Sequence, residues 1–83
     1  MIKELVRLSE EDCRKYAFSV LVDLEDWHDL GVTNKAEGLI RDLEEFRPEV
    51  LPLIARNMST DLFIWAMEVS PAAGEILSKY LSD

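Results

Sequence analysis

The side chains best suited to chemistry gather in one short run of the sequence, at residues 23–29. The run reads Asp-Leu-Glu-Asp-Trp-His-Asp and holds four carboxylates beside the only histidine of the chain. Glu25 and His28 have the Glu-x-x-His spacing of helical di-iron sites, but those sites need two such elements and two further glutamates on facing helices. The run also lacks the spacing and the central glycine of a calcium loop. We therefore expect no metal site.

The single cysteine, Cys13, is the other candidate for catalysis. It falls near the start of an expected helix, where the helix dipole can activate a thiol, but also on the apolar side of that helix, which favours a buried and inert thiol. His28 follows about 22 Å further along the same helix, so the two cannot form a nucleophile–base pair within one subunit. The three glycines are isolated and form no phosphate-binding loop. We expect no catalytic residues and no cofactor.

The elements that position these residues are predicted to be helices, because apolar residues recur with the helical period and none alternate as in a strand. Ser9, followed by three acids, predicts a long helix from about residue 10 to residue 30, which ends at Gly31. A short turn or helix is expected at residues 2–7. The predicted fold is all-α, a compact bundle of about five helices, one long and four shorter, in a single domain over residues 1–83.

The four shorter helices are bounded by caps and prolines. Asn34 and Glu37 fit a capping box, with Thr33 as the rival cap, and Pro48 ends the helix that follows. Because Pro52 cannot supply a helical N–H, a turn or 3₁₀ segment is expected at 48–51 and a short helix at 52–57. Ser59 or Thr60 begins a helix at 60–68, and the pair at 70–71 (Ser-Pro) begins the last one. The inner sides are predicted to carry Cys13, Tyr16, Ala17, Val20, Leu24 and Trp27, then Ala36, Leu39, Ile40, Leu43 and Phe46, then Ala72, Ala73, Ile76, Leu77, Tyr80 and Leu81.

The helix near residues 62–69 is apolar almost all round. A helix without a polar face is normally buried in the middle of a structure. We expect it to be the central element of a monomer, and the alternative is that one of its sides forms a homo-oligomer interface.

Phe18 and Val22 project from the long helix opposite its core side and one turn apart. Glu11, Glu25, Asp26 and Asp29 surround them on the same side. An apolar centre with a charged rim is typical of a protein contact site. The alternative is that other helices of the same domain cover both residues.

The acidic residues are unevenly spread. Residues 23–45 hold eight acids against two bases, a net charge of −6 out of −8 for the whole chain. Such a row of carboxylates can imitate the field of a nucleic-acid backbone, although a solvated face that keeps a small protein soluble is the plainer interpretation. The residues predicted to contact a partner are Phe18, Val22, Glu25, Asp26, Asp29, Asp42, Glu44 and Glu45.

The overall composition excludes some functions and leaves others open. A net charge of −8 opposes direct binding of nucleic acid, no apolar stretch approaches the length of a membrane span, and a single cysteine makes no internal disulfide, so a cytoplasmic setting is expected. The predicted function is a non-enzymatic protein-binding domain, in one form a small acidic inhibitor that docks on the basic, nucleic-acid-binding surface of another protein. The alternative is a structural or regulatory homo-oligomer that associates through an apolar helix face.

Overall fold

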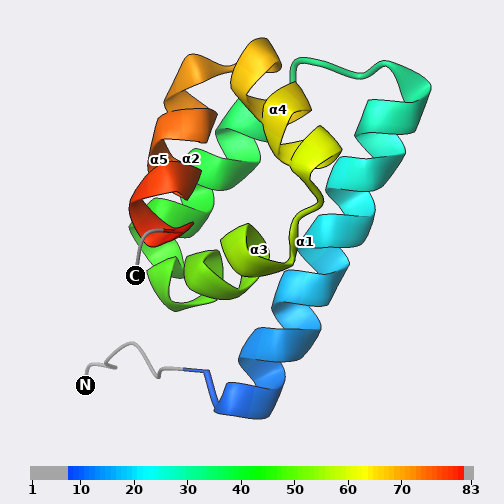
Figure 1. Cartoon of the computed structure of the whole chain (residues 1–83). Coiled ribbons are helices and arrows are strands. Elements are labelled where there is room, and N and C mark those ends of the chain that lie inside the picture. Colours follow the sequence, from blue (N-terminus) through cyan, green and yellow to red (C-terminus); the bar gives the residue numbers. More distant parts are fainter. Residues whose placement is uncertain (1–7, 82–83) are drawn as a thin grey trace.

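The computed structural model describes residues 8–81, and these form an all-α bundle without a strand (Figure 1). The elements are α1 (Glu10–Leu30), α2 (Ala36–Phe46), the 3₁₀ turn η1 (Pro48–Val50), α3 (Leu51–Asn57), α4 (Thr60–Val69) and α5 (Pro71–Leu81). One long helix and four shorter ones were predicted, so the predicted fold class is confirmed. The turn or helix expected at residues 2–7 lies outside the described residues.

Serine caps explain where three of the helices begin. In each case the serine Oγ accepts a hydrogen bond of 3.1 Å from the backbone N–H three residues later, and the serines are Ser9, Ser59 and Ser70. The long helix ends at Gly31, whose φ of 76° lies in the left-handed region that glycine adopts without a steric penalty. These boundaries match the prediction because caps and left-handed stops act within a few residues of sequence.

The core lies where the short helices meet the inner side of α1. Each element contributes to one hydrophobic cluster, and its largest fully buried side chains are Leu24, Ile40, Val50, Leu51, Ile54 and Leu77. α3 packs against both α1 and α5, whereas α2 packs mainly on α5 and η1. The bundle therefore places α1 along one side, with its first turns extending past the other helices (Figure 1).

Three residues predicted on inner sides are exposed instead. Tyr16 lies on the extended part of α1, and Phe46 and Leu81 lie in the last turns of α2 and α5. A helical projection gives the direction of a side chain around the axis but not the length of the neighbouring helix. The prediction that these three residues lie on inner sides was therefore wrong, because the neighbouring helix does not extend far enough to cover them.

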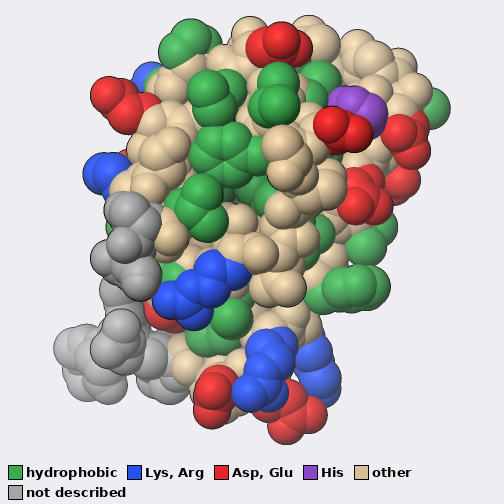
Figure 2. Space-filling view, in the orientation of Figure 1, with side chains coloured by type: hydrophobic (Ala, Val, Ile, Leu, Met, Phe, Trp, Pro, Cys, Tyr) green, Lys and Arg blue, Asp and Glu red, His purple; other side chains and the backbone are tan. Residues whose placement is uncertain are grey.

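α4 is not the central helix that its apolar sequence predicts. Only Leu62 and Ala66 are buried, whereas Ile64 and Met67 are exposed. α4 pairs with α5 at the surface, and Figure 2 shows hydrophobic side chains on the face that these two helices form. Within the described residues no helix combines the length and the apolar character needed to cross a membrane. α5 packs against α2, α3 and α4, and α3 connects α5 with α1.

The predicted capping box at the start of α2 does not form. α2 begins at Ala36, and the residue before it, Lys35, makes no side-chain cap hydrogen bond. The Glu37 carboxylate instead accepts hydrogen bonds from Arg41, at 2.9 Å, and from the Ser70 hydroxyl, at 3.1 Å. The Glu37–Arg41 pair lies within one helix, at the i, i+4 spacing that brings opposite charges together. The Glu37–Ser70 contact joins two helices far apart in sequence, so no local pattern indicates it.

Candidate protein-binding groove

An open groove runs between α1 and α3. Its volume is about 630 Å³. The side chains that line it are Arg14, Ala17, Phe18, Leu21, Val22 and Glu25 from α1, with Leu53 and Asn57 from α3. The groove exists because α3 has only 7 residues and therefore covers only part of the long helix beside it.

The exposed apolar pair predicted on α1 forms one wall of this groove. Phe18 is 69% exposed and Val22 is 41% exposed. Beneath them the floor is built from Leu21 and Leu53, both half-buried against the core. The alternative that other helices cover this pair is wrong for the part of the chain that the structure describes.

The far end of the groove is acidic. Glu25 lines both the groove and a neighbouring hollow between α1 and α4, of about 230 Å³, which also contains Asp29 and Asp61. In Figure 2 acidic side chains gather around the histidine, at the end of α1 that lies beside α4. Asp61 was not predicted for this site. Its only sequence signal was an acid in the first turn of α4, which a helix dipole already explains.

His28 anchors this end of α1. Its Nδ1 lies 3.2 Å from Asp29 Oδ1, and its ring meets the Trp65 ring edge to face, with centroids 5.5 Å apart and planes at 89°. Such edge-to-face pairs stabilise packing between helices. Among residues 8–81 no group of three or more His, Cys, Asp or Glu side chains has the geometry to hold a metal ion. His28 packs α1 against α4 through its contact with Trp65.

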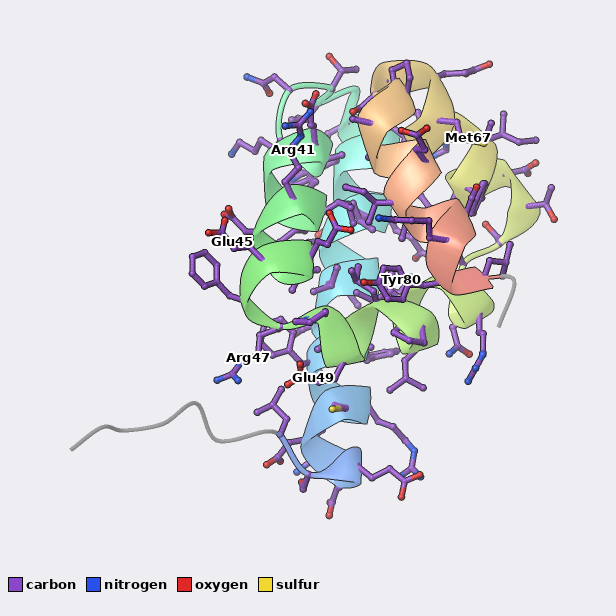
Figure 3. All side chains as sticks on the ribbon, turned by 90° about the vertical axis from the view of Figure 1, so that its left-hand side faces the viewer. Arg41, Glu45, Arg47, Glu49, Met67 and Tyr80 are labelled. Atoms are coloured by element: carbon purple, nitrogen blue, oxygen red, sulfur yellow. The ribbon has the colours of Figure 1, made fainter. Side chains whose placement is uncertain are left out.

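The predicted acidic residues of α2 lie away from the groove. α2 packs on α5, η1 and α4, and Figure 3 shows Glu45 projecting outward from it. Asp42 is exposed as well. Glu44 accepts a hydrogen bond from Lys79 Nζ at 2.7 Å, and this bond and the carboxylate charge raise the pKa of Lys79. The structure thus brings Glu25 to Phe18 and Val22, with Asp26 and Asp29 exposed on the following turn, and separates Asp42, Glu44 and Glu45 from them.

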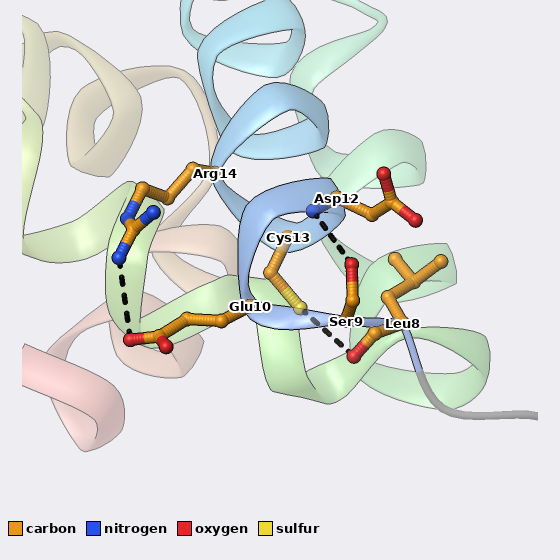
Figure 4. Close-up of polar contacts among 6 residues, drawn as sticks. All are labelled: Leu8, Ser9, Glu10, Asp12, Cys13 and Arg14. Carbon is orange, nitrogen blue, oxygen red and sulfur yellow. Dashed lines mark hydrogen bonds and ion pairs between the residues drawn. The ribbon is translucent and has the colours of Figure 1, made fainter.

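Cys13 is buried at the base of α1, as predicted. Its Sγ donates to the Leu8 carbonyl at 3.8 Å, below the Ser9 cap (Figure 4). His28 lies in the same unbroken helix, about 22 Å away by helical rise. The structure therefore does not bring the thiol and the imidazole together.

The groove must be interpreted from its own geometry. Comparison of the chain with protein-family models, with curated proteins and with solved structures finds no match.

Proposed function

We propose that this protein is a non-enzymatic protein-binding domain that docks through the α1–α3 groove on a partner with a basic surface. The observation that carries the proposal is the exposure of Phe18, 69% of whose surface faces solvent next to Val22. Burial of a phenylalanine side chain contributes about 1.5–3 kcal/mol of favourable free energy. A partner that covers Phe18 would therefore bind more tightly. An aromatic side chain at the centre with charged residues at the rim is the usual anatomy of an interface.

The charge around the groove supports a basic partner. Glu25, Asp26 and Asp61 have no cation paired with them among residues 8–81. A partner that brings Lys or Arg side chains to this end would pair with these carboxylates and would associate faster at low salt. Where the covered surface is one that binds nucleic acid, docking would inhibit that binding.

The test compares two phenylalanines that are both exposed. Phe18→Asp and Phe46→Asp change the same residue type on α1 and α2, and Phe46 is 59% exposed but outside the groove. Proteins captured from cell extract by the wild type should be lost with Phe18→Asp, retained with Phe46→Asp, and eluted by added salt. Equal capture by both variants, with unchanged thermal unfolding, would contradict the proposal.

Self-association through α4 is the second candidate. It is favoured by the exposure of Ile64 and Met67, which leaves the outer side of a strongly apolar helix facing solvent. Sedimentation of the wild type against Met67→Lys separates the two candidates. A dimer that the substitution dissociates would support self-association, and a strict monomer at tens of micromolar would exclude it.

A further inference from the structure

The two ends of the α1–α3 groove differ in charge. Arg14 borders it at the end nearest the start of α1, where its guanidinium lies 3.3 Å from the Glu10 carboxylate. Glu25 borders it at the other end, next to Asp29 and Asp61. The apolar wall lies between the two ends. A segment that fills the groove therefore meets the Arg14–Glu10 ion pair at one end and an excess of carboxylates at the other.

We propose, resting on the function proposed above, that the occupant of this groove is a basic amphipathic α-helix of a partner protein, lying antiparallel to α1. Its apolar residues would pack on Phe18, Val22 and Leu53. Lys or Arg side chains in its first turns would lie over the Glu25 end of the groove.

The length and shape of the groove suit a helix. From Arg14 to Glu25 the axis of α1 advances about 16 Å, which matches three turns of a second helix laid alongside it. A helix docked in a groove presents apolar residues at i, i+3 or i+4, and i+7. The midpoint of Phe18 and Val22 is about 10 Å from that of Glu25 and Asp29, or two turns. The basic residues of the partner should therefore stand about seven positions before the centre of its apolar stripe.

The charge asymmetry sets the direction of the partner helix. The first turn of a helix carries the positive end of its dipole, which is stabilised by nearby carboxylates, and the last turn carries the negative end. With its first turn at Glu25, the partner helix places the positive end of its dipole beside Glu25, Asp29 and Asp61. A helix parallel to α1 places its negative end beside these carboxylates, so the antiparallel direction is preferred. At the other end the Arg14 charge is paired with Glu10, so the carboxylate end sets the direction.

Two synthetic peptides of identical composition test this inference on the full chain. Both are stapled helices of about four turns with leucines at i, i+3 and i+7, so that helix content is matched. One carries its lysines in the first turn, and the other carries them in the last turn. Fluorescence anisotropy at low salt should show the first peptide binding about tenfold more tightly, because two or three charge–dipole and charge–charge contacts are gained. Glu25→Gln with Asp61→Asn should abolish that preference, whereas Asp42→Asn, an acid on α2, should leave it intact.

The outcomes separate this inference from the broader function. If both peptides bind equally and Phe18→Asp abolishes both, the groove is a docking site but the basic antiparallel helix is wrong. Tighter binding of the peptide with lysines in its last turn would also contradict the antiparallel orientation of the partner helix. If neither peptide binds the wild type, the helical occupant is rejected, while the capture experiment with Phe18→Asp and Phe46→Asp still decides the proposed function.

Discussion

The α2–α5 side and the α1–α3 side of this bundle differ in the contacts that their residues make. On the α2–α5 side, Glu37 joins Ser70, Glu44 joins Lys79, and Gly74 lets α5 approach α4 closely, so these residues are used within the domain. On the α1–α3 side, Phe18 and Val22 face solvent, and Glu25 makes no ion pair with any described residue. The acid-rich segment at residues 23–45 spans both sides. The number of charges in a segment thus says less about a binding surface than the contacts that those charges already make.

The largest expected effect is on stability, and it distinguishes the inner side of α1 from its outer side. Leu24→Ala removes a fully buried side chain and should lower the free energy of unfolding by about 2–5 kcal/mol. Phe18→Ala should change it by no more than about 0.5 kcal/mol, because the side chain is mostly exposed. Urea denaturation of both variants measures the difference. A large loss of stability in Phe18→Ala would mean that this residue belongs to the core and not to a docking surface.

Gly74 tests the close packing of α5 on α4. A Cβ at this position would collide with the Met67 side chain and would lie 3.1 Å from its Cα. Gly74→Ala should therefore destabilise the protein by about 1–3 kcal/mol. Gly38→Ala is the matched control. It adds the same methyl group to α2 where nothing lies within 4 Å, and it should raise stability by up to about 1 kcal/mol. Thermal melts in which both substitutions shift the Tm in the same direction would contradict this account of the α4–α5 contact.

A comparison of the Ser59 and Ser70 caps separates the contribution of a local cap from that of a long-range hydrogen bond. Ser70 is 2% exposed, and its hydroxyl both caps α5 and donates to Glu37, whereas Ser59 caps α4 only. Ser70→Ala should lower the free energy of unfolding by about 2 kcal/mol, since a buried hydrogen bond is lost with the cap. Ser59→Ala should lower it by about 1 kcal/mol. Chemical denaturation gives both values, and equal losses would show that the Glu37 contact adds nothing.

The smallest expected effect is the pH dependence of the Glu44–Lys79 pair. Glu44 raises the folded-state pKa of Lys79 above its ordinary value of 10.5. The stabilisation is fully present below the unfolded-state pKa and is lost as the pH rises through the higher folded-state pKa. Glu44→Gln should therefore reduce the loss of stability above about pH 10, and Glu45→Gln, on the same helix, should not. Denaturation midpoints at neutral and alkaline pH make the comparison. Identical alkaline behaviour in both variants would exclude a contribution from the pair.

The candidate site was predictable in part. Phe18 and Val22 are separated from the core stripe by their angle around α1, which the spacing of residues specifies once the helix is known. The contribution of Leu53 from α3 to the groove floor was not predictable, because nothing local shows which helix packs beside α1. The same limit applies to Asp61, which joins Glu25 and Asp29 only through the packing of α4 on α1.

The sequence by itself determined the helices of this protein and most of their boundaries. Ser9, Gly31, Ser59 and Ser70 act on the backbone within about four residues, so their effect can be derived without knowledge of the fold. Only the tertiary structure decided that α4 lies at the surface, that Glu37 bonds to Ser70 rather than capping α2, and that the acids of α2 lie away from the groove. These outcomes depend on which helices meet. That choice is made by the summed burial of the whole core and not by any short run of residues.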